Sequence, residues 1–309
     1  MRHHQQRDDS TYEGRVLARP EEEVTDQGLG FDVVTLMSRR RMLQALGLGA
    51  AAVGLAACGS TGTTDAAGSS TTAAGSSAAA GEIPEETAGP YPGDGSNGPD
   101  VLELSGIVRS DIRSSFAGSS GTADGVPMTL ELLVTDLAND GAPFAGVAVY
   151  VWHCDREGRY SMYTDGVTDQ NYLRGVQVAG ADGKVSFTSI FPACYRGRWP
   201  HIHFEVYPDQ ASITDDAKVI ATSQVALPED VSDTVYAESG YEASVSNMER
   251  VSLTDDNVFS DDGGANQLAT VTGYVRSGYR VSLTVGVDTT TTPTGGQNAG
   301  DGAPSGRRR

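Results

Sequence analysis

The sequence predicts an all-β fold: an antiparallel β-sandwich with long loops, flanked by disordered N- and C-terminal segments. Short runs that are rich in β-branched and aromatic residues recur through the middle of the chain. Turn signals such as Asp140-Gly141, Asp182-Gly183 and Pro208-Asp209 separate these runs. No long amphipathic helix pattern lies among them. Spaced strands with short turns are typical of a sandwich, and about 200 residues are enough to bury a core.

Six segments carry the strand pattern, and several alternate apolar and polar residues so that one face points inward. They span residues 128–137, 146–155, 184–192, 199–208, 219–227 and 268–287. Within residues 147–163 we expect a strand, a turn at residues 156–158, and a returning strand that carries Tyr160.

The N-terminal part of the chain indicates export. Residues 1–36 are polar with mixed charge, and Met37 is a candidate start of translation. Ser38-Arg39-Arg40-Arg41, followed by the apolar residues 43–57, resembles a twin-arginine export signal. The apolar run is too short to span a membrane. We therefore expect residues 1–57 to be an N-terminal extension and signal.

Cys58 follows the apolar run directly, and Leu55-Ala56-Ala57-Cys58 resembles a lipobox. In that interpretation Cys58 becomes the lipidated N-terminus of the mature protein. It would anchor the exported protein to the outer face of the cytoplasmic membrane or to the cell envelope. The alternative is an ordinary core cysteine.

Composition divides the rest of the chain. Residues 58–82 are mostly Gly, Ser, Thr and Ala and are expected to form a flexible linker. Residues 83–287 would be the folded domain, and residues 288–309 a disordered tail. The formal net charge of -19 argues against nucleic acid and anionic lipid surfaces as partners. The one membrane contact that we expect is the lipid anchor.

A pair of histidines marks the candidate site. His201 and His203 lie in a strand-forming run, so their side chains would share one face while Ile202 and Phe204 occupy the other. Two imidazoles on one face can chelate a single metal ion. The alternative is an exposed strand edge with two unrelated histidines. The chain has only five histidines, which favours the metal site.

A wider pattern surrounds this pair. It reads W-x5-G-x-Y, then P-x-x-Y, then R-x-x-H-I-H, at residues 152–160, 192–195 and 198–203. It resembles the intradiol ring-cleavage dioxygenases, which include catechol and protocatechuate dioxygenases. The resemblance extends from about Glu85 to Val287. It also covers a T-x-G-P-Y segment at residues 87–91 and three later stretches, at residues 173–175, 181–187 and 222–224.

The resemblance implies an Fe(3+) site with Tyr160, Tyr195, His201 and His203 as ligands. It implies an enzyme that cleaves a catechol-type ring between its two hydroxylated carbons with O2, giving a muconate-type diacid. It also implies a β-sandwich, without the helical dimerisation region of catechol dioxygenases. Two anionic oxygens and two neutral imidazoles suit ferric iron better than zinc or copper.

The same resemblance assigns roles to three residues. Tyr195 would leave the iron as the substrate arrives and accept a proton from it. Arg198 and Gln224 would stabilise the charge that develops on the ring. The expected partners are a small aromatic diol and O2, and an oligomer is compatible with the sequence.

The remaining polar residues near these motifs are assigned less specifically. Cys154 and Cys194 would be the two cysteines left in an exported domain, and this even count favours a disulfide between them. His153 and Asp155 are candidates for structural or supporting roles, and the role of Arg174 stays open.

A second function hypothesis comes from another class: a cell-surface β-sandwich binding module that keeps the scaffold without dioxygenase activity. The complete set of two tyrosines and two histidines argues against it. Colour would separate the two, because tyrosinate-to-iron charge transfer makes a protein red.

Overall fold

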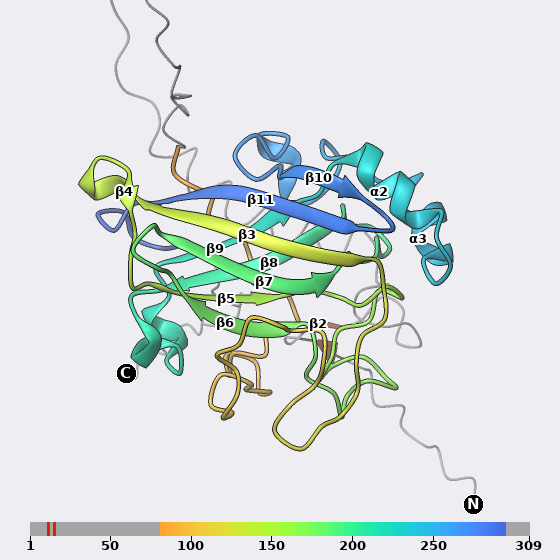
Figure 1. Cartoon of the computed structure of the whole chain (residues 1–309), viewed down its shortest axis with the longest axis horizontal. Coiled ribbons are helices and arrows are strands. Elements are labelled where there is room, and N and C mark those ends of the chain that lie inside the picture. Colours follow the sequence, from red (N-terminus) through yellow and green to blue (C-terminus); the bar gives the residue numbers. More distant parts are fainter. Residues whose placement is uncertain (1–10, 13–14, 17–80, 295–309) are drawn as a thin grey trace, which may run out of the picture.

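The computed structural model describes residues 11–12, 15–16 and 81–294 (Figure 1). The predicted export signal, the lipidation site at Cys58 and the linker lie almost wholly outside these residues, as does the end of the predicted tail. Two two-residue strands, β1 (Thr11–Tyr12) and β2 (Arg15–Val16), pair antiparallel. The rest of the described fold is built from two larger sheets.

The first sheet has five strands, arranged around β3 (Pro127–Asp136). β3 pairs antiparallel with β4 (Ala142–Pro143) and β7 (Lys184–Ile190). On its other side it pairs with β11 (Gly278–Val287), which forms a hairpin with β10 (Thr270–Tyr274). The β3–β11 pair is parallel, so the predicted all-antiparallel arrangement is wrong at this point. The long connection from β3 to β11 allows the chain to return in the same direction.

The second sheet has four strands in the order β6-β5-β8-β9, and every pair in it is antiparallel. These strands are β5 (Ala148–Trp152), β6 (Arg174–Val178), β8 (His201–Tyr207) and β9 (Ala221–Ala226). β8 therefore lies in the interior of the sheet, between β5 and β9.

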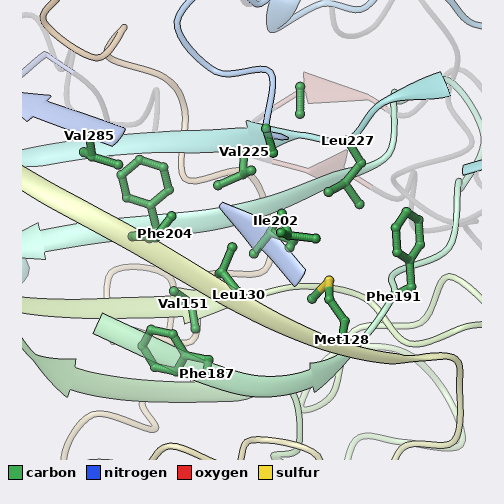
Figure 2. Close-up of a cluster of buried hydrophobic side chains, with 14 of the residues drawn as sticks. Met128, Leu130, Val151, Phe187, Phe191, Ile202, Phe204, Val225, Leu227 and Val285 are labelled. Atoms are coloured by element: carbon green, nitrogen blue, oxygen red, sulfur yellow. The ribbon is translucent and has the colours of Figure 1, made fainter. Parts of the chain in front are cut away.

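One hydrophobic core joins the two sheets. In Figure 2 side chains from β3, β7 and β11 meet side chains from β5, β8 and β9. Alternate residues of β3 are buried, as expected for a strand with one face in a core. From β8, Ile202, Phe204 and Val206 point into this core. The face of β8 that carries the histidines therefore points the other way, out of the intersheet core.

That other face is covered as well. All seven residues of β8 are buried. A second apolar cluster packs side chains of the chain segment before β3, such as Val101, Leu102 and Ile107, against Tyr150, Trp152 and Tyr207. The histidine face is thus enclosed by loops, which is the setting in which a polar site can be shielded from water.

Short helices connect the strands. α2 (Glu229–Tyr236) and α3 (Glu242–Met248) follow β9 and lie near one end of the strands in Figure 1. The described part of the chain also contains four 3-10 helices: η2 (Leu137–Asn139), η3 (Gln210–Ser212), η4 (Asp216–Lys218) and η5 (Phe259–Asp261). No helix among the described residues is long and apolar enough to cross a bilayer.

The segment that enters the domain crosses from one sheet to the other. Ile83 N–H donates to the Gly286 carbonyl of β11 at 2.9 Å, and Glu86 N–H donates to the Thr222 carbonyl of β9 at 2.8 Å. We call residues 83–89 the entry strap. The strap ends at Gly89, beside His203.

Candidate metal centre

Four side chains from three parts of the chain meet on the histidine face of β8. The Oη of Tyr160 lies 3.5 Å from His201 Nε2 and 3.2 Å from His203 Nε2. The Oη of Tyr195 lies 3.1 Å from His201 Nε2, and the two Nε2 atoms are 3.1 Å apart. Two phenol oxygens and two imidazole nitrogens therefore converge on one point.

The pairing of β8 fixes where the histidines stand. His203 lies opposite Trp152 on β5 and opposite Gln224 on β9. The imidazole of His203 stacks on the Trp152 indole, with centroids 4.9 Å apart and an interplanar angle of 7°. Gly89 also approaches the ring closely: a Cβ added there would lie 3.3 Å from His203 Cε1. The ring is thus in close contact with a strand neighbour and with the entry strap.

The protonation state of the histidines suits a metal ligand. His201 Nδ1 contacts the Trp199 carbonyl at 2.5 Å, and a carbonyl only accepts, so Nδ1 carries the proton. Burial lowers the pKa of His201 and of His203 well below the usual range, which keeps both rings neutral. The Nε2 of His201 therefore presents a lone pair to the cluster.

The two phenols are also matched to a cation. Burial raises the pKa of Tyr160 and of Tyr195 far above that of an exposed tyrosine, so neither ionises at neutral pH by itself. A cation between them would reverse this effect. No three His, Cys, Asp or Glu side chains gather as a metal site anywhere in residues 81–294. The donor set found here fits a metal ion that accepts two phenolates and two imidazoles.

Tyr160 is positioned by the turn that follows β5. Asp155 shapes this turn, because its carboxylate accepts hydrogen bonds from the backbone N–H groups of Glu157 and Arg159, each at 3.0 Å. Gly158 has a φ of 84°, and a Cβ there would lie 3.2 Å from the Cβ of Tyr195. The turn thus brings the two tyrosine segments into contact. Tyr160 itself lies in a loop, so the predicted returning strand is wrong.

Arg198 and Gln224 lie beside the four donors and contact each other. Arg198 Nη2 donates to Gln224 Oε1 at 2.6 Å, and Gln224 Nε2 donates to the Thr87 carbonyl at 3.0 Å. Both ends of the amide are therefore fixed. The positive charge of Arg198 opposes the effect of burial on the pKa of Tyr195. The structure thus brings six of the predicted site residues together.

Comparison with known proteins finds similarity to dioxygenases. A family model described as Dioxygenase matches residues 97–206. An intradiol ring-cleavage dioxygenase from Tetranychus urticae superposes with a TM-score of 0.54 at 24% identity, over 71% of this chain and 98% of that chain. A second dioxygenase crystal structure matches at 25% identity with the same TM-score and coverage.

The chain is therefore similar to dioxygenases over residues 97–206, and its fold matches that of an intradiol ring-cleavage dioxygenase. Curated relatives match over shorter stretches. A chlorocatechol 1,2-dioxygenase from Rhodococcus opacus is 40% identical over 55 residues, which are 18% of this chain and 21% of that protein. Catechol 1,2-dioxygenase 1 from Acinetobacter lwoffii is 34% identical over 108 residues, 28% of this chain and 34% of that protein. The chain therefore spans about a fifth to a third of the curated relatives that it matches.

The predicted disulfide between Cys154 and Cys194 is wrong. Cys154 and Cys194 are both free and buried. Their thiols point to different partners: Cys154 Sγ donates to the Ala193 carbonyl at 3.6 Å, and Cys194 Sγ to the Arg198 carbonyl at 3.4 Å. The two side chains also belong to different apolar clusters, on the two sides of the second sheet. The number of cysteines alone does not show on which side of the sheet each one lies.

Three polar residues that the sequence left open have structural roles. His153 contacts the Cys154 carbonyl at 2.8 Å and Ser189 Oγ at 2.7 Å, away from the four donors. Asp155 shapes the Tyr160 turn. Arg174 is 1% exposed and donates hydrogen bonds to the carbonyls of Tyr91, Pro92 and Ser161. It ties the segment after the entry strap to the loop that carries Tyr160.

One residue of the site was missed altogether. Asp256 is fully buried and forms an ion pair with Arg198, with Oδ2 2.9 Å from Nε. It lies in the run Thr254-Asp255-Asp256-Asn257, which in the sequence is typical of an exposed polar loop. No spacing or periodicity distinguishes Asp256 from Asp255, so only the fold identifies it. Asp256 therefore reaches Arg198 from outside residues 97–206, the stretch that the family model matches.

Proposed function

We propose that the protein is a non-haem iron(III) dioxygenase that cleaves a catechol-type ring between its two hydroxylated carbons with O2, giving a muconate-type diacid. The observation that supports this most is the convergence of Tyr160, Tyr195, His201 and His203, with donor contacts of 3.1 to 3.5 Å. Two phenolates and two neutral imidazoles suit ferric iron better than zinc or copper.

When bound, the ion would supply Lewis acidity, which favours the anionic form of a phenol or catechol and draws electron density from the ring. The chain's own residues would manage the protons. Tyr195 is half-buried whereas Tyr160 is 2% exposed, so Tyr195 is the phenol that an incoming diol reaches first. We assign Tyr195 Oη as the acceptor of a substrate proton, and Tyr160 as a ligand that stays in place.

Arg198 and Gln224 would act on the substrate ring. The guanidinium is a fixed positive charge beside the phenols, and its side chain is 12% exposed, so water screens it little. Gln224 is held by Arg198 on one side and the Thr87 carbonyl on the other. Such preorganised groups stabilise negative charge that develops on a bound ring.

The test begins with the purified full-length protein. We expect bound iron close to one per chain, a broad visible absorption from tyrosinate-to-iron charge transfer, and O2 uptake with at least one member of a catechol panel. With isotopically labelled O2, both oxygen atoms should appear in a ring-opened diacid. A colourless protein that consumes no O2 after iron loading would contradict the proposal and favour the binding module instead.

We also propose that the protein is exported and held at the outer face of the cytoplasmic membrane or in the cell envelope. The support is sequence alone: the twin-arginine pattern at residues 38–41 and the lipobox-like run that ends at Cys58. Replacing Arg39 and Arg40 by lysine should leave precursor in the cytoplasm. Cys58→Ser should release the protein from the membrane fraction, and unchanged attachment would exclude the lipid anchor.

A further inference from the structure

Asp256 is a buried carboxylate that receives only N–H donors. Its Oδ2 accepts from Arg198 Nε at 2.9 Å and from Trp199 N–H at 2.7 Å. Its Oδ1 accepts from the backbone N–H groups of Val258 and Phe259, at 2.8 Å and 3.2 Å. Both oxygens are therefore acceptors, as in an ionised carboxylate. An asparagine at position 256 would place its NH2 group against the N–H donors that one of the two carboxylate oxygens now accepts from.

Arg198 depends on this carboxylate for its orientation. The guanidinium is nearly enclosed, and a buried cation without a partner is costly, so it would turn toward water if the carboxylate were absent. Its second contact, to Gln224 Oε1, fixes the other side of the group. Gln224 lies opposite His203 in the β8–β9 pair. The guanidinium is therefore held between a loop carboxylate and the strand that flanks the four donors.

The same carboxylate reaches the site by a second path. Trp199 N–H donates to Asp256, and the Trp199 carbonyl accepts the Nδ1 proton of His201. The peptide groups on both sides of Trp199 are thus fixed, one by Asp256 and one by His201. Outer partners of this kind commonly orient metal ligands.

We propose that Asp256 is a positioning residue whose carboxylate holds Arg198 in the orientation that the candidate site uses. This inference rests on the proposed function for the role of Arg198, but the pairing itself can be tested without metal. The simpler alternative is that Asp256 only caps the start of η5 through Val258 and Phe259. In that case its loss would loosen the loop whether or not Arg198 is present.

Asp262 offers a matched control in the same region of the chain. It is exposed, and its carboxylate accepts from the N–H groups of Gly264 and Ala265 at 2.7 Å and 3.2 Å. Among residues 81–294, no arginine forms an ion pair with Asp262. Asp262→Asn therefore perturbs a loop-capping carboxylate without touching Arg198.

The first experiment is a double-mutant cycle on the iron-loaded enzyme. Asp256→Asn should lower turnover by about 10- to 100-fold, while Asp262→Asn leaves it near the wild-type value. If Asp256 acts through Arg198, then Asp256→Asn should change turnover by no more than about twofold in an Arg198→Gln background. The same large factor in both backgrounds would show that the two residues act independently, and would overturn the proposal.

The second experiment uses metal-free protein and remains valid if the enzyme has no dioxygenase activity or if Asp256→Asn folds poorly. Arg198→Ala leaves a buried carboxylate beside an empty space, and methylguanidinium should fill it. We expect this probe to raise the unfolding midpoint of Arg198→Ala in a saturable way, with no effect on the wild type. Methylammonium, which lacks the planar fork, should stabilise less. No stabilisation by methylguanidinium, or equal stabilisation of the Arg198→Ala/Asp256→Asn variant, would overturn the pairing.

Discussion

At the scale of single residues, the two tyrosines of the site differ in burial although their chemistry is the same. Tyr160 contacts both imidazoles and is almost fully enclosed, whereas Tyr195 contacts His201 from a half-buried position. We expect Tyr195→Phe to retain iron through the other three ligands with altered colour. Its turnover should fall by about 10² to 10⁴, since a proton acceptor is lost.

Tyr160→Phe should lose most of its iron, because it removes the ligand that bridges toward both histidines. Iron content and single-turnover rates of the two variants measure this difference directly. Equal iron loss in both, or normal turnover in Tyr195→Phe, would show that the two roles are assigned wrongly.

Gly89 provides a test of the contact between the entry strap and His203. It has a φ of 75°, and an added Cβ would press on the imidazole at 3.3 Å. Gly166 is a matched control, because its φ is 83° and nothing lies within 4 Å of its added Cβ. Both alanine variants should lose about 1 kcal/mol from backbone strain. Only Gly89→Ala should also weaken iron binding, measured by competition with a chelator.

The residues that the sequence could identify are those in a tight local pattern. His201 and His203 share a face because strand side chains alternate, and that follows from residues 201–203 alone. Asp256 could not be found in this way, since it meets Arg198 across 58 residues of chain. The missing disulfide has the same origin: which side of a sheet a cysteine faces is a property of the whole packing.

At the scale of elements, β6 supplies the residue that joins two loops. Arg174 donates to the carbonyls of Tyr91, Pro92 and Ser161, and to the hydroxyl of Tyr150 at 3.0 Å. Arg174→Lys keeps the charge but cannot reach these acceptors together. We expect it to destabilise the metal-free protein by about 2 to 3 kcal/mol, measured by urea unfolding. The exposed Arg113→Lys should change stability by less than about 0.5 kcal/mol.

Strands with clear alternation could be located from the sequence, but their ends and partners could not. The segment 268–287 proved to be a hairpin, because a turn at residues 275–277 separates β10 from β11. β6 was read only as part of a hairpin motif. Its first three residues are buried, so it lacks the alternation that marks a half-exposed strand. The short helices α2 and α3 carry too few turns for a periodic pattern.

At the scale of the whole molecule, burial of ionisable groups makes stability depend on pH. Burial, with help from Asp261, raises the pKa of Glu86 to about 8. Between pH 4.5 and about 8 the folded protein therefore binds a proton that the unfolded chain has released. Stability from this source is complete below pH 4.5 and is lost as the pH rises through 8.

We expect Glu86→Gln to remove this dependence. As the pH rises from 4.5 to 8, the unfolding free energy of the wild type should fall relative to that of the variant. The fall should be at most about 1.4 kcal/mol per pH unit. Protonation of the buried histidines at low pH affects both proteins equally and cancels in the difference. Glu103→Gln, at an exposed position, serves as the control for replacing a glutamate by glutamine.

The entry strap has a further consequence, which concerns association between molecules. Strand edges with free N–H and C=O groups are templates for pairing with other chains. The strap occupies such groups on β9 at Thr222 and on β11 at Gly286, and the Leu268 bridge occupies the β9 edge at Ala226. A chain shortened to begin at Ala88 would uncover the β9 edge at Thr222 and the end of β11 that extends beyond its pairing with β10. Light scattering should then show that it self-associates, whereas a chain that begins at Gly81 stays dispersed.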